Sequence, residues 1–233
     1  MALTFFLAGM GAELIGFGVS TISMSLLPFV LPLQVVIPLV AIISLIATAI
    51  VAYKTKTNGL TKLLLPLFGG SLVGIPFGLM SLGSIDERLL ATILGVMLIL
   101  VAVYNLFAKK MPIPYQKKRV GAAVGLMAGF FGATLNINGP LLGIHAANNK
   151  RNSAAKRKDI IATYMFVTGV FIVFGHTFAG RVTGTVITHS VLSLPFLALG
   201  IFVGAKLFKK LNSLWLRYLI YLMVIIAGLL LII

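Results

Sequence analysis

The feature that most constrains this chain is a series of apolar segments, each about as long as a membrane is thick. About 20 residues in helical conformation cross a hydrocarbon core of about 30 Å. Six segments have this length and are bounded by charged or turn-forming residues. They are residues 33–53, 63–82, 89–107, 159–180, 187–208 and 214–233. We therefore expect an all-α integral membrane protein that crosses the bilayer several times.

The composition agrees with a lipid environment. The chain has 233 residues, of which 60% are apolar and only 10% are charged, and its mean hydropathy is +1.11. A soluble domain carries about 25% charged residues, because its surface faces water. There is no cysteine, which excludes disulfides, thiolate metal sites and iron–sulfur clusters. We expect no metal and no other cofactor.

The formal net charge of +15 does not indicate nucleic acid as a partner. The basic residues stand in short clusters between apolar segments, where they orient membrane helices and contact anionic lipid headgroups. The N-terminus has no Lys or Arg before its first apolar stretch and carries Glu13 within it. That pattern is not typical of a signal peptide, and we interpret the segment as part of the mature protein.

Two glycine-rich stretches, residues 2–31 and 120–147, do not fit a simple crossing. Apart from Glu13 they are uncharged. A straight helix of 28 residues would be about 42 Å long, too long for a core of about 30 Å, whereas two crossings would leave about 21 Å each. The remaining possibilities are a strongly tilted span and a re-entrant hairpin that returns to the side it entered from.

The distribution of basic residues favours the hairpin. If each stretch crosses once, the 19 basic residues divide nine against ten between the two sides. If 120–147 returns, the clusters in 109–119 and 150–158 share one side, and the division becomes 17 against 2, with Arg88 and Arg181 alone on the other. Positively charged loops face the cytoplasm. Residues 109–119 are therefore predicted to be a cytoplasmic linker.

The chain also repeats itself. The motif Gly-x-x-x-Gly at 70–74 recurs at 200–204, and each copy is followed by an arginine that heads an apolar helix, at an offset of 129–130 residues. Residues 1–108 form the first predicted repeat and residues 120–233 the second. Each repeat comprises a hairpin and three membrane helices, an odd number of crossings. We therefore predict an inverted-repeat helical bundle, an organisation common in secondary transporters.

The hairpin tips are the predicted binding site. Interrupted helices inside a membrane lie within protein or line a wet cavity, and a helix that begins there presents free N–H groups and a positive dipole end to an anion. The first tip lies near residues 16–21 and the second within 132–140. The candidate substrate-binding residues are Gly16, Phe17, Gly18, Ser20, Thr21, Thr134, Asn136, Asn138, Gly139 and Pro140. The glycines before the tips (Gly9, Gly11, Gly121 and Gly125) are instead expected to allow close helix packing.

Few ionisable residues lie in the apolar stretches. Glu13 is the only acidic residue inside one of them, and it is a candidate for carrying a coupling proton. His145, on the returning arm of the second hairpin, is the other coupling candidate. We expect Asp159 to cap the helix it begins, and Lys206 to extend to the membrane interface.

The order of these motifs resembles one family of bacterial permeases, the sulfite exporter TauE/SafE family. The resemblance rests on Gly16-Phe17-Gly18 followed by Pro28, and on Gly125, Gly129 and Gly132 followed by Gly139-Pro140. Val19 and Ser20 depart from the family pattern, in which further glycines are common. The resemblance implies export of sulfite, an organosulfonate or a related sulfur-containing anion across the bacterial cytoplasmic membrane.

Two alternatives to a secondary transporter of sulfur-containing anions stay open, an anion channel and a permease for a non-sulfur carboxylate. An enzyme is not expected, because the sequence has no HExxH, GxSxG or paired-aspartate pattern and only four acidic residues. A P-loop is also missing from the sequence. The expected partners are a small anionic substrate and the lipid bilayer, with the protein a monomer or a homodimer.

Overall fold

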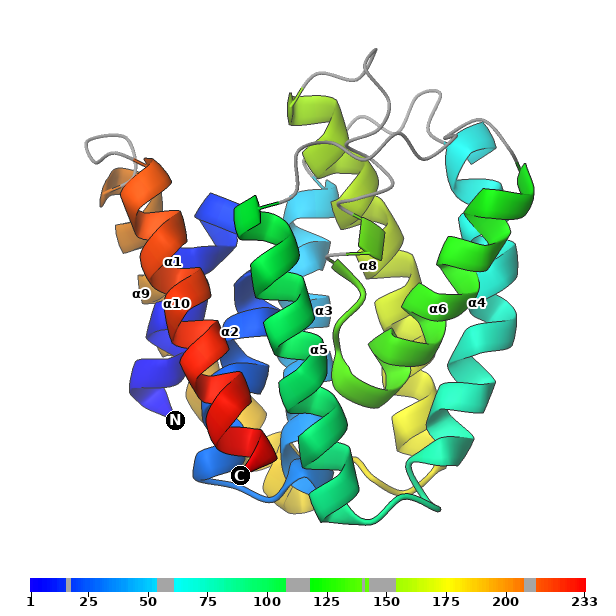
Figure 1. The fold of residues 1–233 in the computed structure, drawn as a ribbon, viewed down its shortest axis with the longest axis horizontal. Coiled ribbons are helices and arrows are strands. Elements are labelled where there is room, and N and C mark those ends of the chain that lie inside the picture. Colours follow the sequence, from blue (N-terminus) through cyan, green and yellow to red (C-terminus); the bar gives the residue numbers. More distant parts are fainter. Residues whose placement is uncertain (16–17, 54–60, 108–117, 140, 143–153, 208–212) are drawn as a thin grey trace. The chain divides into compact units, whose positions relative to one another are not determined.

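The structure, a computed structural model, describes residues 1–15, 18–53, 61–107, 118–139, 141–142, 154–207 and 213–233. Every regular element in these ranges is helical, which confirms the predicted all-α class (Figure 1). The elements are α1 (Ala2–Ile15), α2 (Gly18–Leu26), η1 (Leu27–Phe29), α3 (Leu33–Tyr53), α4 (Thr61–Ser81), α5 (Glu87–Phe107), α6 (Lys118–Leu135), α8 (Ala154–Phe178), α9 (Gly184–Leu207) and α10 (Ser213–Ile232).

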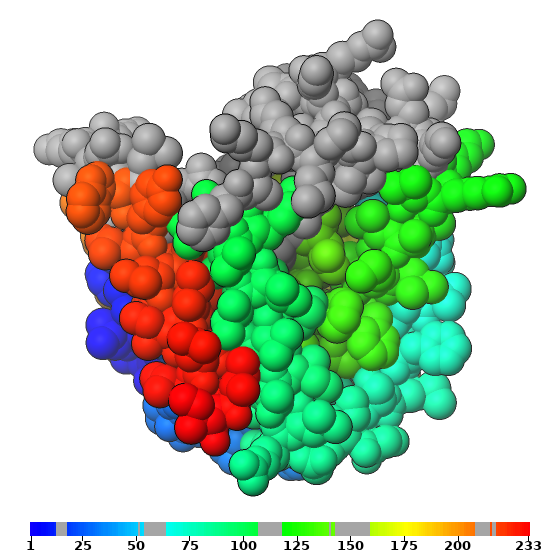
Figure 2. Space-filling model, viewed as in Figure 1, coloured from blue at the N-terminus to red at the C-terminus, as the bar shows by residue number. Residues whose placement is uncertain are grey.

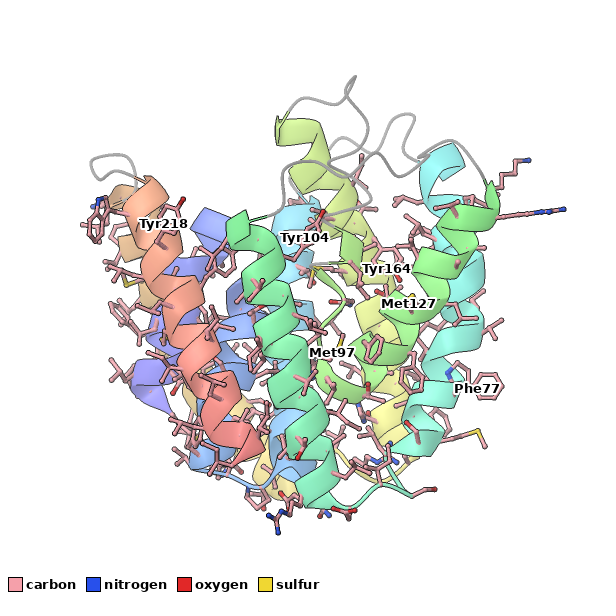
Figure 3. The ribbon with its side chains drawn as sticks, viewed as in Figure 1. Phe77, Met97, Tyr104, Met127, Tyr164 and Tyr218 are labelled. Atoms are coloured by element: carbon pink, nitrogen blue, oxygen red, sulfur yellow. The ribbon has the colours of Figure 1, made fainter. Side chains whose placement is uncertain are left out.

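Five of the described helices are long and apolar enough to cross a membrane. Their spans are Leu33–Ile50, Leu64–Ser81, Glu87–Leu106, Asp159–Phe178 and Gly184–Leu207, and shorter apolar helices cover Ala2–Ala12, Gly18–Phe29 and Tyr218–Ile232. Large apolar side chains on these helices face outward. Phe77, for example, is 63% exposed and points away from α4 (Figure 3). Apolar faces of this extent suit lipid rather than water, as expected of a multi-pass membrane protein.

Acidic residues cap two of the helices. Asp86 Oδ1 accepts a hydrogen bond of 2.8 Å from the Leu89 N–H at the start of α5, and Glu87 Oε1 accepts one of 2.7 Å from the Leu33 N–H at the start of α3. Each carboxylate satisfies an N–H that has no acceptor within its own helix and lies at the positive end of the helix dipole.

The predicted capping role of Asp159 is wrong. The helix α8 begins at Ala154, so Asp159 lies in its second turn and not at its N-cap. The physical reason is that the basic run before Asp159 consists of Ala, Lys and Arg, which are strong helix formers, and the helix therefore extends through it.

The chain divides into two compact units, which we describe in turn. Unit 1 comprises Met1–Ile43, Ile85–Ala108 and Gly180–Ile233, and unit 2 comprises Ser44–Ser84 and Lys109–Ala179. Each unit combines helices from both predicted repeats. Unit 1 contains α1, α2 and η1, from the first predicted hairpin, with α5, α9 and α10, whereas unit 2 contains α4, α6 and α8. The sequence did not predict that each compact unit would combine helices from both repeats.

The most extensive helix contact of unit 2 joins α4 to α6, which run side by side in the same direction (Figures 1 and 2). Glycines allow their backbones to touch. A Cβ atom on Gly70 would collide with the carbonyl oxygen of Ala122, and one on Gly125 with that of Leu67. The predicted packing role of Gly125 is thereby confirmed.

The same arrangement recurs in unit 1 between α1 and α9, its most extensive helix contact. A Cβ atom on Gly200 would collide with the carbonyl oxygen of Phe6, and one on Gly9 would lie 2.5 Å from that of Leu197. The contacts have the same spacing in both units. Leu67 and Gly70 on α4 are three positions apart, as are Leu197 and Gly200 on α9, and the same holds for their partners on α6 and α1. Each Gly-x-x-x-Gly helix therefore packs on the hairpin arm of the other predicted repeat.

A third contact, also in unit 1, joins α5 to α10. These are the last helices of the two predicted repeats, and they lie side by side and antiparallel (Figures 1 and 2). Their closest approach is at Gly95 and Gly228. Corresponding helices of the two predicted repeats thus run in opposite directions within one compact unit.

Candidate functional site

The first tip, in unit 1, lies where α1 gives way to α2. The helix α1 ends at Ile15 and α2 begins at Gly18. A Cβ atom on Gly18 would collide with the carbonyl oxygen of Gly11, so only glycine lets α2 start this close to α1. The first N–H groups of α2 have no acceptors within their own helix, and they are buried with it.

The helix α2 is short, apolar at its ends and rich in hydroxyl groups. Its residues from Gly18 to Ser25 are all buried. Ser20 and Thr21 are each 3% exposed, and Ser23 and Ser25 are 0% exposed. The hydroxyl of Ser25 donates to the carbonyl oxygen of Ile22 over 2.9 Å. The hydroxyls of Ser20 and Thr21 lie close to the start of α2, where they are neutral hydrogen-bonding groups near the positive end of the dipole.

The second tip, in unit 2, is built on a left-handed residue. The helix α6 ends at Leu135, and Asn136 follows with φ of 55°. The Asn136 N–H donates to the Gly132 carbonyl oxygen over 3.1 Å, which is the αL cap of a helix C-terminus. Asparagine adopts this conformation more readily than other residues with a side chain. The turn after α6 is therefore made by Asn136.

Whereas Asn136 ends α6, Asn138 begins the next helical turn. Its carbonyl oxygen accepts a hydrogen bond of 3.2 Å from the Leu142 N–H, so Asn138 is an N-cap, a position that favours asparagine. Its side chain lies against Gly132, where a Cβ atom would be 3.2 Å from Asn138 Nδ2. Asn136 and Asn138 are each 6% exposed. The backbones of Asn136 and Asn138 thus have a structural role at helix ends, in addition to the predicted binding role of their side chains.

The structure places the remaining candidate residues as follows. Thr134 is 3% exposed, and its hydroxyl donates to the Phe130 carbonyl oxygen over 2.9 Å. Gly139 is buried at the start of the helical turn after Asn138. Gly16, Phe17, Pro140 and His145 lie outside the described residues, as does the side chain of Glu13, whose backbone belongs to α1. That the two tips meet stays a prediction.

A polar cluster that the sequence analysis missed ties together three helices of unit 2. The Ser71 hydroxyl on α4 lies 2.8 Å from the Leu67 carbonyl oxygen and 3.0 Å from that of Gly125 on α6. It also forms a short hydrogen bond with the Tyr164 hydroxyl on α8. Since Ser71 donates to carbonyl oxygens, Tyr164 is the donor in that bond. The Tyr164 ring stacks on Phe68, with centroids 5.6 Å apart.

No local pattern identifies this cluster, because its members are far apart in sequence. Ser71 lies inside the first Gly-x-x-x-Gly motif, where a small polar residue is ordinary in a membrane helix. Tyr164 is 0% exposed, and only the packing of α8 on α4 brings its hydroxyl to Ser71. The cluster holds α4, α6 and α8 together, and α6 is the helix that ends at the second tip.

The chain matches the sequence model of one protein family, described as Sulfite exporter TauE/SafE, over residues 1–231. Comparison with curated proteins gave no match, and comparison with solved structures gave none either.

Proposed function

The chain belongs to the sulfite exporter TauE/SafE family, and from this premise we propose that it is a secondary transporter of a small sulfur-containing anion. The substrate class is sulfite, an organosulfonate or a related oxyanion. The direction is outward across a bacterial cytoplasmic membrane, and the energy comes from an ion gradient, with Glu13 and His145 as the candidate coupling residues.

The observation that carries the proposal is the interruption of helix at two buried, polar tips. Charged residues are scarce there, so the anion would be held by hydroxyls, amides and N–H groups rather than by a salt bridge. Neutral donors suit a transporter, because they replace the hydration of the anion without binding it too tightly to release. Ser20 and Thr21 supply such donors at the first tip, and Asn136 and Asn138 at the second.

The packing of the helices supports the inverted repeat that such a transporter would use. The contact of α4 with α6 and that of α1 with α9 have the same residue spacing, as expected of two copies of one structural element. The antiparallel course of α5 and α10 (Figure 1) is expected if one copy is inverted relative to the other. Inverted repeats allow the two halves to exchange conformations, which opens one site to each side in turn.

Flux measurements on the purified protein in liposomes test the proposal. Liposomes loaded with unlabelled sulfite should transiently accumulate labelled sulfite from outside above its equilibrium level, because a transporter exchanges substrate through one alternating site. Protein-free liposomes are the control. Equilibration without transient accumulation would indicate the channel alternative. Liposomes loaded with unlabelled acetate or methanesulfonate are tested in the same way with the matching labelled anion. Accumulation with acetate, but with neither sulfite nor methanesulfonate, would indicate the carboxylate permease.

A variant at the second tip separates binding from helix capping. Asn138→Ser keeps a side chain that caps a helix and removes the amide. A hydrogen bond to a charged group contributes about 1.5–3 kcal/mol, so we expect the affinity for sulfite to fall by roughly 10- to 100-fold with little loss of stability. Wild-type affinity in Asn138→Ser would remove Asn138 from the site.

A further inference from the structure

Many serine and threonine hydroxyl groups in the described helices share one kind of acceptor. A serine or threonine in a helix ordinarily donates to the carbonyl oxygen one turn earlier. The described residues that donate in this way are Thr48, Ser71, Thr92, Thr134, Thr168, Thr177, Ser190 and Ser193.

Ser23, in the middle of α2, does not follow this rule. Its side chain is 0% exposed, and its Oγ has no hydrogen-bond partner among the described residues. The carbonyl oxygen of Val19, one turn earlier, is the partner that the other helices would lead us to expect. Leaving a buried hydroxyl unpaired costs free energy. Because the Ser23 hydroxyl does not donate to the Val19 carbonyl oxygen, it is available to form a hydrogen bond with a bound ligand.

The position of Ser23 suits a ligand of the first tip. Ser20 and Ser23 are three residues apart and share a face of α2, about 4.5 Å apart along the helix axis. One oxyanion can bridge that separation, since each O–H···O hydrogen bond is about 2.8 Å long. The face they share begins at the start of α2, where the first N–H groups lack intrahelical acceptors.

We propose that Ser23 is a further substrate-binding residue, whose hydroxyl donates a hydrogen bond to an oxygen atom of the anion bound at the first tip. The inference rests on the proposed function and extends its site one turn deeper into α2. It also explains why a buried helix keeps a hydroxyl that the protein itself does not use.

The experiment compares two neighbouring serines of the same helix in the purified, detergent-solubilised protein. Ser23→Ala removes the unpaired hydroxyl, and Ser25→Ala removes one that is bonded to Ile22. The thermal midpoint without ligand and the affinities for sulfite and methanesulfonate are measured for both. We expect Ser23→Ala to keep or raise the thermal midpoint and to weaken binding by about tenfold or more. Ser25→Ala should lower the midpoint and bind as tightly as the wild type.

Ser23→Cys is a second variant with nearly the same shape. Its thiol is a poor donor, so its affinity should also fall while the helix packing is retained. Wild-type affinity in both Ser23 variants would overturn the inference, and so would a lowered midpoint with unchanged affinity, because the hydroxyl would then have a structural partner. Absence of binding by the wild-type protein itself would overturn the proposed function together with the inference.

Discussion

A Cβ atom added to Gly95 would lie 2.5 Å from the carbonyl oxygen of Gly228, and one added to Gly228 would lie 2.8 Å from the carbonyl oxygen of Gly95. The relationship is reciprocal, and the two residues belong to the last helices of the two predicted repeats. The contact has no room for a side chain on either helix.

Gly95→Ala is therefore expected to destabilise the protein. The added methyl group would force α5 away from α10, and overpacking of this kind costs about 1–3 kcal/mol. Gly69→Ala is the matched control, since it makes the same change in a membrane helix where a Cβ atom would meet nothing within 4 Å. Thermal midpoints in detergent should fall for Gly95→Ala and not for Gly69→Ala. An equal effect at the two positions would contradict the close contact.

Two substitutions of Asn136 separate the role of its backbone conformation from the role of its side-chain amide. Asn136→Ala places a residue that resists positive φ at 55°, at a cost of about 1–2 kcal/mol, whereas Asn136→Gly accepts that conformation. Asn136→Ala should lower the thermal midpoint, and Asn136→Gly should not. If the amide binds the anion, both variants should lose affinity for sulfite. Full affinity in Asn136→Gly would restrict Asn136 to the helix cap.

The hydrogen bond between Ser71 and Tyr164 should appear as coupling in a double-mutant cycle. Tyr164→Phe keeps the ring that stacks on Phe68 and loses the hydroxyl, at a cost of about 1 kcal/mol. Ser71→Ala leaves the Tyr164 hydroxyl buried without its partner, which costs about 1–3 kcal/mol. The double variant should lose less stability than the two single variants together. Strict additivity in thermal or denaturant unfolding would show that the two side chains do not interact.

Single cysteines test the predicted orientation, since the chain has none of its own. The 17-to-2 division of basic residues predicts that 109–119 and 150–158 both face the cytoplasm and that the C-terminus faces outward. Cysteines introduced singly into the two loops should resist an impermeant thiol reagent in intact cells and react after permeabilisation, and one after Ile233 should react at once. Reaction of only one loop in intact cells would mean that 120–147 crosses the membrane, and the inverted repeat would be abandoned.

The sequence alone predicted the class of the protein. Length and hydropathy are local properties, and they identify membrane helices because lipid leaves the backbone no partner outside a helix. The interruption between Ile15 and Gly18 and the one at Asn136 fall within the predicted tips, because glycine and asparagine tolerate conformations that end a helix.

Only the tertiary structure decided which helices and side chains meet. The pairing of α4 with α6 and of α1 with α9 crosses between the predicted repeats, and it depends on the fit of two surfaces rather than on either sequence segment. Ser71 and Tyr164 are 93 residues apart, and Ser23 differs from Ser25 only in what surrounds it. A hydrogen bond requires a suitable distance and angle between its donor and its acceptor. The packing of the helices sets both, and no local sequence pattern encodes that packing.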